Sequence, residues 1–216
     1  MRKSLYCLLG ILFLVGCHKK NDEFTLFHED GRAKPIVKIA PVIDSSNYDL
    51  SWSLSEELTE LIVNITAQKG TLYIPSEKAS HDHITQSPFG NDLAWVKNHY
   101  KNSEFVVFTE IVEHEDSVAD KKLDPEVKDI RKQSHDLNIS MRVRVVDLRY
   151  DEPKVVLQEM IKDTFYISKN VLHSNCDLVA WGTEEYNKSP MGLAHIQVAK
   201  YLVDKINDYI LLAKSR

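Results

Sequence analysis

Apolar positions near the start of the predicted domain form one short continuous run and one helical stripe. The run covers residues 36–43, which is typical of a strand buried on both faces, and Pro41 within it predicts an interrupted ladder. Ser53 and Glu56 have the spacing of a capping box, and Gly70 is a typical stop, so these positions should bound a helix. Its apolar stripe has helical spacing and consists of Leu54, Leu58, Leu61, Ile62 and Ile65.

Two further strands and a second helix are predicted between residues 71 and 112. Residues 71–75 are expected to form a short strand and residues 91–99 a helix, and the apolar run at 105–112 should be the central strand. A strand-helix-strand-helix-strand order with short links favours parallel neighbours and right-handed crossovers.

The pattern changes to alternation in the second half of the chain. Residues 138–146 and 155–167 alternate apolar and polar side chains, and residues 150–154 between them suit a hairpin loop. The pattern leaves open on which face of the hairpin Glu159 and Asp163 lie. The alternative is that they pair across the strands with Arg142 and Arg144.

A last helix completes the predicted domain. Ser189 can cap it, Pro190 suits its first turn, and its apolar stripe consists of Ile196, Ala199, Val203, Ile206 and Ile210. Residues 113–135 and 171–188 are predicted to be long connections. Together the elements predict one α/β domain over residues 35–216, a mixed sheet of about five strands in the order β-α-β-α-β-β-β-α with helices packed on it.

The N-terminal segment has the pattern of a secretory signal. Arg2 and Lys3 precede an apolar stretch at residues 5–15, which is too short for the roughly 20 residues that cross a bilayer as a helix. The stretch ends in Leu14-Val15-Gly16-Cys17, which resembles the lipobox of bacterial lipoproteins.

The lipobox resemblance implies cleavage between Gly16 and Cys17 and lipidation of Cys17, with the acyl chains, palmitate among them, anchoring the chain in a membrane. Residues 17–34 should then be a flexible tether, and His18 after the lipidated cysteine favours the periplasmic face of the outer membrane. The alternative is an ordinary secreted protein with a cysteine near its cleavage site.

Composition narrows the possible partners. A hydrophobic content of 43% and a charged content of 27% are typical of a globular domain. Removal of residues 1–16, which include Arg2 and Lys3, changes the formal charge from −5 to −7, so no nucleic-acid partner is expected. Cys176 would remain as an unpaired thiol, either buried, free or bridged to another chain.

The element order behind a lipobox resembles the α/β envelope-lipoprotein domain of CsgG, LpoB and the amino-terminal part of TolB. Residues 50–57 and the closing helix are also similar to small uncharacterised lipoproteins of chlamydiae. Either resemblance implies a role in assembly or regulation in the bacterial envelope.

Candidate chemistry is dominated by histidine beside carboxylate, a ligand set that suits zinc. The candidates, all in predicted loops, are His28-Glu29-Asp30, His81-Asp82-His83, His114-Glu115-Asp116 and His135-Asp136. No HExxH or CxxC spacing supports them, and the pair His173 and Cys176 lacks the other parts of a nucleophilic site.

The sequence therefore favours a non-enzymatic lipoprotein that binds another envelope protein or itself, with no catalytic residue, metal or cofactor. The alternative is a metal-binding or hydrolytic periplasmic protein that uses the histidine-rich loops.

Overall fold

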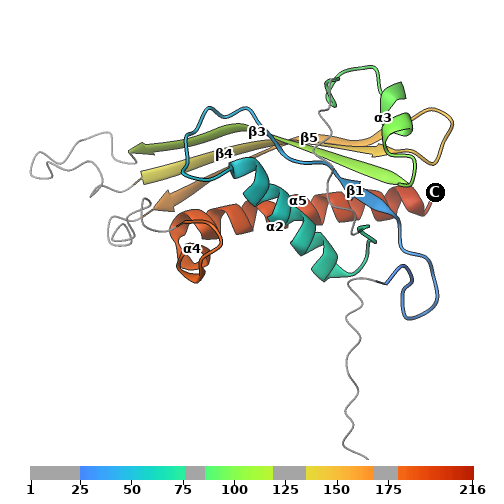
Figure 1. Ribbon diagram of the computed structural model, residues 1–216, viewed down its shortest axis with the longest axis horizontal. Coiled ribbons are helices and arrows are strands. Elements are labelled where there is room, and N and C mark those ends of the chain that lie inside the picture. The colour runs from blue at the N-terminus through green and yellow to red at the C-terminus, as the bar shows by residue number, and fades with distance from the viewer. Residues whose placement is uncertain (1–24, 76–85, 119–134, 168–179) are drawn as a thin grey trace, which may run out of the picture.

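The computed structural model describes residues 25–75, 86–118, 135–167 and 180–216. Five strands form one mixed sheet in the order β1-β3-β4-β5, and β2 also pairs with β3 (Figure 1). β1 and β2 run parallel to β3, whereas β3, β4 and β5 are antiparallel. These elements confirm the predicted α/β class with a mixed sheet; the strands are β1 Val37–Ile39, β2 Ile43–Asp44, β3 Phe105–Val118, β4 His135–Asp147 and β5 Lys154–Ile167.

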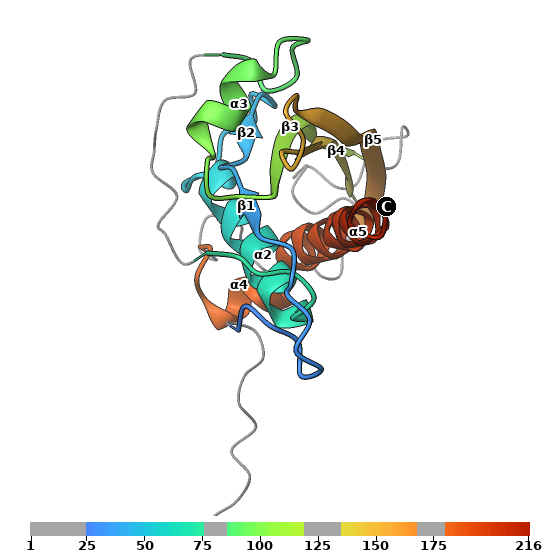
Figure 2. The same cartoon turned by 90° about the vertical axis from the view of Figure 1, so that its right-hand side faces the viewer.

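Helices lie on both sides of this sheet (Figure 2). The two long helices, α2 Leu54–Lys69 and α5 Pro190–Lys214, cover one face, and the main core lies between them and the sheet. Short helix α3, Ala94–His99, covers part of the other face over a small second core. The fourth helix, α4 Glu184–Lys188, leads directly into α5.

Local signals set the ends of the long helices as predicted. The Ser53 hydroxyl accepts the Glu56 amide at 3.2 Å, and Gly70 ends α2 in the left-handed conformation at φ 66°. Ser189 caps α5 by accepting the Gly192 amide at 3.0 Å. The stripes are only partly as predicted, because Leu61, Ile65 and Ile196 are half-buried while Glu57 and His195 are fully buried.

Pro41 interrupts the first strand as predicted. The Ala40 amide still donates to the Val107 carbonyl at 3.0 Å, but Pro41 has no N–H to continue the ladder. The Val42 amide donates instead to the Thr59 hydroxyl of α2 at 2.9 Å, and pairing with β3 resumes at Ile43. The predicted run at residues 36–43 is therefore two short strands.

Several predicted boundaries are wrong. Residues 71–75 form no strand beyond one parallel bridge between Ile36 and Tyr73, and α3 begins at Ala94. Residues 113–118, predicted as a connection, continue β3, because β4 begins at His135 and pairs with them throughout. Polar side chains are tolerated there because one face of this extension is open to solvent.

The alternative of pairing Arg142 or Arg144 with acidic residues of β5 is also excluded. Met160 and Gln158 lie opposite the two arginines, so Glu159 faces the helices instead and pairs with Lys205. Arg142 pairs with Glu110 of β3. Arg144 donates to Gln158 and to the carbonyl oxygens of residues 88, 89 and 90.

Candidate functional site

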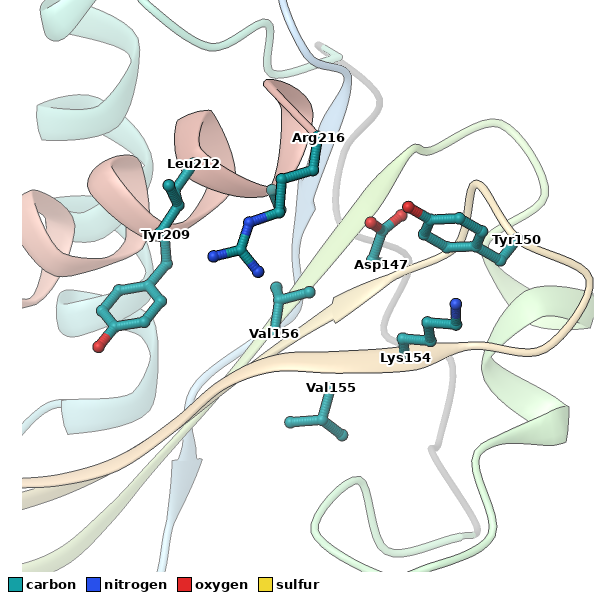
Figure 3. A pocket seen from close by; sticks show the side chains of 9 residues that line it. Asp147, Tyr150, Lys154, Val155, Val156, Tyr209, Leu212 and Arg216 are labelled. Atoms are coloured by element: carbon teal, nitrogen blue, oxygen red, sulfur yellow. The ribbon is translucent and has the colours of Figure 1, made fainter.

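A cavity of about 340 Å³ lies between the C-terminal end of α5 and the beginning of β5 (Figure 3). Apolar and aromatic side chains from both elements and from the β4–β5 loop form most of its wall. The residues that line it are Asp147, Tyr150, Lys154, Val155, Val156, Tyr209, Leu212, Ala213 and Arg216.

Among the side chains that line this cavity, positive charges outnumber negative ones. Lys154 Nζ lies 3.8 Å from the centre of the Tyr150 ring, and Arg216 approaches from the end of α5. Across the described residues, neither cation has a carboxylate partner. The one side-chain carboxylate in the lining, Asp147, is 1% exposed and is bound by Arg149. The cavity therefore offers two available cations beside apolar walls.

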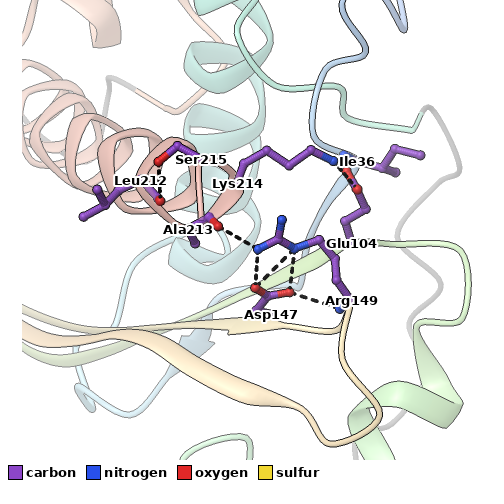
Figure 4. Close-up of polar contacts among 8 residues, drawn as sticks. All are labelled: Ile36, Glu104, Asp147, Arg149, Leu212, Ala213, Lys214 and Ser215. Carbon is purple, nitrogen blue, oxygen red and sulfur yellow. Dashed lines mark hydrogen bonds and ion pairs between the residues drawn. The ribbon is translucent and has the colours of Figure 1, made fainter.

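Arg149 connects Asp147 in the cavity lining to the end of α5 (Figure 4). Its guanidinium donates to both carboxylate oxygens of Asp147, at 3.0 Å from Nε to Oδ1 and 2.7 Å from Nη2 to Oδ2. The same Nη2 donates to the Ala213 carbonyl at 2.8 Å, near the end of α5. Hydrogen bonds to Asp147 raise the pKa of Arg149, so this cation is permanently charged.

A neighbouring ion pair ties the same helix end to the first strands. Lys214 pairs with Glu104, whose other carboxylate oxygen accepts the Ile36 amide at 3.0 Å (Figure 4). Four segments distant in sequence thus meet at the C-terminal end of α5, whose last residues form part of the cavity wall.

A second polar cluster lies inside the main core. The Glu57 carboxylate of α2 accepts a hydrogen bond from Nδ1 of His195 at 2.7 Å. Nε2 of His195 lies 2.8 Å from Nε2 of His114 on β3. The hydroxyl of Tyr186 and the indole N–H of Trp52 also donate to the Glu57 carboxylate. We call these five residues the buried histidine network.

A β-bulge brings His114 into this network. The register of β3 against β4 shifts between Ile111 and Glu113, which leaves Val112 as the extra residue. Before the bulge the odd-numbered Ile111 faces the helices; after it the even-numbered His114 does. Without the extra residue, strand alternation would point His114 to the opposite face.

The surroundings of Glu57 and His114 lower the pKa values of both groups. Burial by itself raises the pKa of Glu57, but the hydrogen bond and charge of His195 and the donors Tyr186 and Trp52 outweigh it and lower this pKa. Burial, with a smaller contribution from His195, lowers the pKa of His114 to about 4. Within the described ranges, the Nδ1 atom of His114 has no hydrogen-bond partner.

Folding stability should therefore fall in mild acid. The unfolded chain protonates this histidine near pH 6.5 and the folded chain near pH 4, so the stabilisation is complete above pH 6.5 and is lost as the pH falls toward 4. We expect a loss of about 2 kcal/mol between pH 7 and pH 5, measured by urea unfolding. His114→Gln should flatten this dependence and His28→Gln, in the N-terminal turn, should not; equal slopes in both variants would contradict the assignment.

The buried histidine network has the components of a proton relay but no access for a substrate. Glu57, His195 and His114 are each no more than 2% exposed. Its hydrogen bonds join α2, α4, α5 and β3 inside the main core.

The histidine–carboxylate candidates at 114–116 and 135–136 meet through one pair, His135 and Asp116, but the described candidates do not gather at a single site. His114 belongs to the buried histidine network, His135 contacts Asp116 at 2.9 Å, and Asp30 pairs with Arg32. The motifs at 114–116 and 135–136 lie in β3 and β4 rather than in loops, which corrects that prediction. Where the chain is described, no group of three or more histidine, cysteine, aspartate or glutamate side chains is placed to hold a metal ion.

Other predicted positions lie outside the described residues: Gly16, Cys17, His18, His81, Asp82, His83, His173 and Cys176. Conversely, sequence reasoning missed Glu57, His195 and the cavity. Glu57 and His195 were detectable in part, because each is a polar residue within the apolar stripe of a helix. None of the helices in the described ranges has the length and apolar content needed to cross a membrane.

The fold has relatives among solved structures. The hypothetical protein CT253 from Chlamydia trachomatis is 24% identical with a TM-score of 0.66, over 82% of this chain and 98% of that one. Protein XCC0632 from Xanthomonas campestris, of the DUF330 family, is 9% identical with a TM-score of 0.50, over 85% of this chain and 90% of that one. These similarities show a shared fold, and the first agrees with the resemblance to chlamydial proteins.

A weaker similarity, with a TM-score of 0.37 and 12% identity, relates 81% of this chain to 99% of lipoprotein GNA1162 from Neisseria meningitidis. A similarity this low supports no argument about the chain. No curated protein matches the chain in sequence. A family model does match residues 23–214, and the chain therefore belongs to the family of unknown function DUF7499.

Proposed function

We propose that this protein is a lipid-tethered, non-enzymatic binding module of the bacterial envelope, anchored through Cys17 on the periplasmic face of the outer membrane. The lipobox Leu14-Val15-Gly16-Cys17 supports the anchor, because dual or triple acylation holds a protein stably on a bilayer. The domain then acts on a partner protein at the membrane surface.

The observation that carries the binding role is the gathering of exposed apolar side chains at the cavity. Four of the twelve exposed large hydrophobic residues in the described ranges line it: Tyr150, Val155, Tyr209 and Leu212. Apolar and aromatic side chains around a preformed hollow are typical of binding sites, since their burial against a partner is favourable. The buried histidine network supports this role indirectly by joining the helices behind the sheet.

The anchor is tested by comparing the wild type with Cys17→Ala in a bacterial host. We expect the wild type to carry acyl mass on Cys17, to fractionate with membranes and to co-purify with an envelope protein after cross-linking. Cys17→Ala should lose the acyl mass and the membrane association, whereas the matched variant Cys7→Ala should lose neither. An unmodified Cys17 in the mature wild type would contradict the proposal.

A further inference from the structure

We infer that the cavity and the adjoining edge of β5 bind an extended acidic segment of the partner, which lies beside β5 as an added strand and places a carboxylate between Lys154 and Arg216. This inference rests on the proposed binding function and specifies its partner chemistry. Strand addition at a sheet edge combines backbone hydrogen bonds with side-chain pockets.

The edge of β5 provides the backbone part of such a site. β5 is 14 residues long and, within the described ranges, pairs only with β4. Alternate N–H and C=O groups of an edge strand point away from its neighbour and are available to another chain. The lining of the cavity includes the first three residues of this strand, so an extended segment on the edge continues into the cavity.

The charges identify the chemistry of the occupant. The chain as a whole has a net charge of −5, yet among the side chains that line this cavity two are cations without a side-chain carboxylate partner in the described residues, and the one carboxylate, Asp147, is neutralised by Arg149. An aspartate, glutamate or terminal carboxylate is the group that Lys154 and Arg216 would bind with charge-assisted hydrogen bonds. A positively charged segment would meet two like charges at the same place.

The apolar walls identify the neighbours of that carboxylate. Val156, Tyr209 and Leu212 lie toward the helix side of β5, whereas Val155 points away from that side (Figure 3). Side chains of an added strand alternate between the two sides. The preferred segment thus has aliphatic or aromatic residues two positions before or after its acidic residue, on the same side of the added strand.

The test uses the full mature chain and a random octapeptide library displayed on phage. Selected peptides are synthesised with a fluorescent label and titrated by anisotropy. We expect enrichment of an acidic residue with aliphatic or aromatic residues two positions away. The double variant Lys154→Gln/Arg216→Gln should weaken binding about tenfold. The control Lys101→Gln/Lys200→Gln makes the same charge change at exposed positions outside the cavity and should bind as the wild type does.

A location readout completes the test. A photo-crosslinking residue at Val155 or Tyr209 should capture the selected peptide, and the same residue at exposed Val112 of β3 should not. Peptides without an acidic residue, unchanged binding by the double variant, or a Val155 cross-link only to a second copy of the chain would each overturn the inference. If the wild type captures an envelope partner but the peptide does not compete with that partner, the inference fails and the proposed function stands. If the wild type neither associates with membranes nor captures a partner, the proposed function itself fails.

Discussion

Glu57→Ala is expected to lower the free energy of unfolding by about 3 to 5 kcal/mol, because each buried donor left without its acceptor costs about 1 to 3 kcal/mol. The change leaves the ring N–H of His195, the Tyr186 hydroxyl and the Trp52 indole N–H without their acceptor. All of these groups surround a carboxylate that is fully buried, so water cannot replace it without opening the core. Urea unfolding at pH 7.5 measures the loss.

Glu60→Ala is the matched control for this variant. It removes the same side chain from the same helix at an exposed position, and we expect a change within about 0.5 kcal/mol. Since a domain of this size typically has 5 to 15 kcal/mol of stability, the Glu57 variant should remain folded but unfold at clearly lower urea concentration. Equal stability of the two variants would show that the buried histidine network does not stabilise the fold.

Arg149→Ala is expected to cost about 3 kcal/mol and to weaken the site as well as the fold. It leaves the Asp147 carboxylate, 1% exposed, without its cation and removes the donor to the Ala213 carbonyl. The Phe105 ring also loses the guanidinium that lies 4.9 Å from its centre. Thermal unfolding measures the cost, and the double variant Asp147→Ala/Arg149→Ala should recover part of it because the buried charge is then absent.

The chain contains a matched control for this pair. Arg32 and Asp30 have the same spacing, and the backbone N–H of each arginine donates to its aspartate, but their side chains are 80% and 51% exposed. Arg32→Ala should therefore leave the midpoint of thermal unfolding nearly unchanged, because solvent screens this exposed pair. If both arginine variants lose the same amount of stability, the burial of Asp147 does not determine how strongly the Asp147–Arg149 pair stabilises the fold.

Features encoded in a few adjacent residues were predictable. Ser53, Gly70 and Ser189 bound helices because capping depends on the chemistry of one turn. Pro41 interrupts the first ladder because its missing N–H is a property of the residue itself. The alternating pattern also identified β4, β5 and the loop between them, because one face of these strands is covered and the other is largely polar.

Features that depend on register were not predictable. Ser140 lies opposite Glu113 rather than Val112, and this one-residue shift decides that His114 faces the helices. No single segment records the shift, since it results from the pairing of two long strands. The pairing of Arg142 with Glu110 instead of β5 has the same origin.

The sequence by itself thus determined the fold class, both ends of α2 and the start of α5, because each of these depends on the periodicity of apolar residues or on local conformational preference. Only the tertiary structure decided which polar residues meet. Glu57 and His195 are 138 positions apart, and the cavity joins Asp147 of β4 to the last turn of α5. Such contacts depend on strand register and helix packing together, because both are set by the burial of the whole core and not by any one segment.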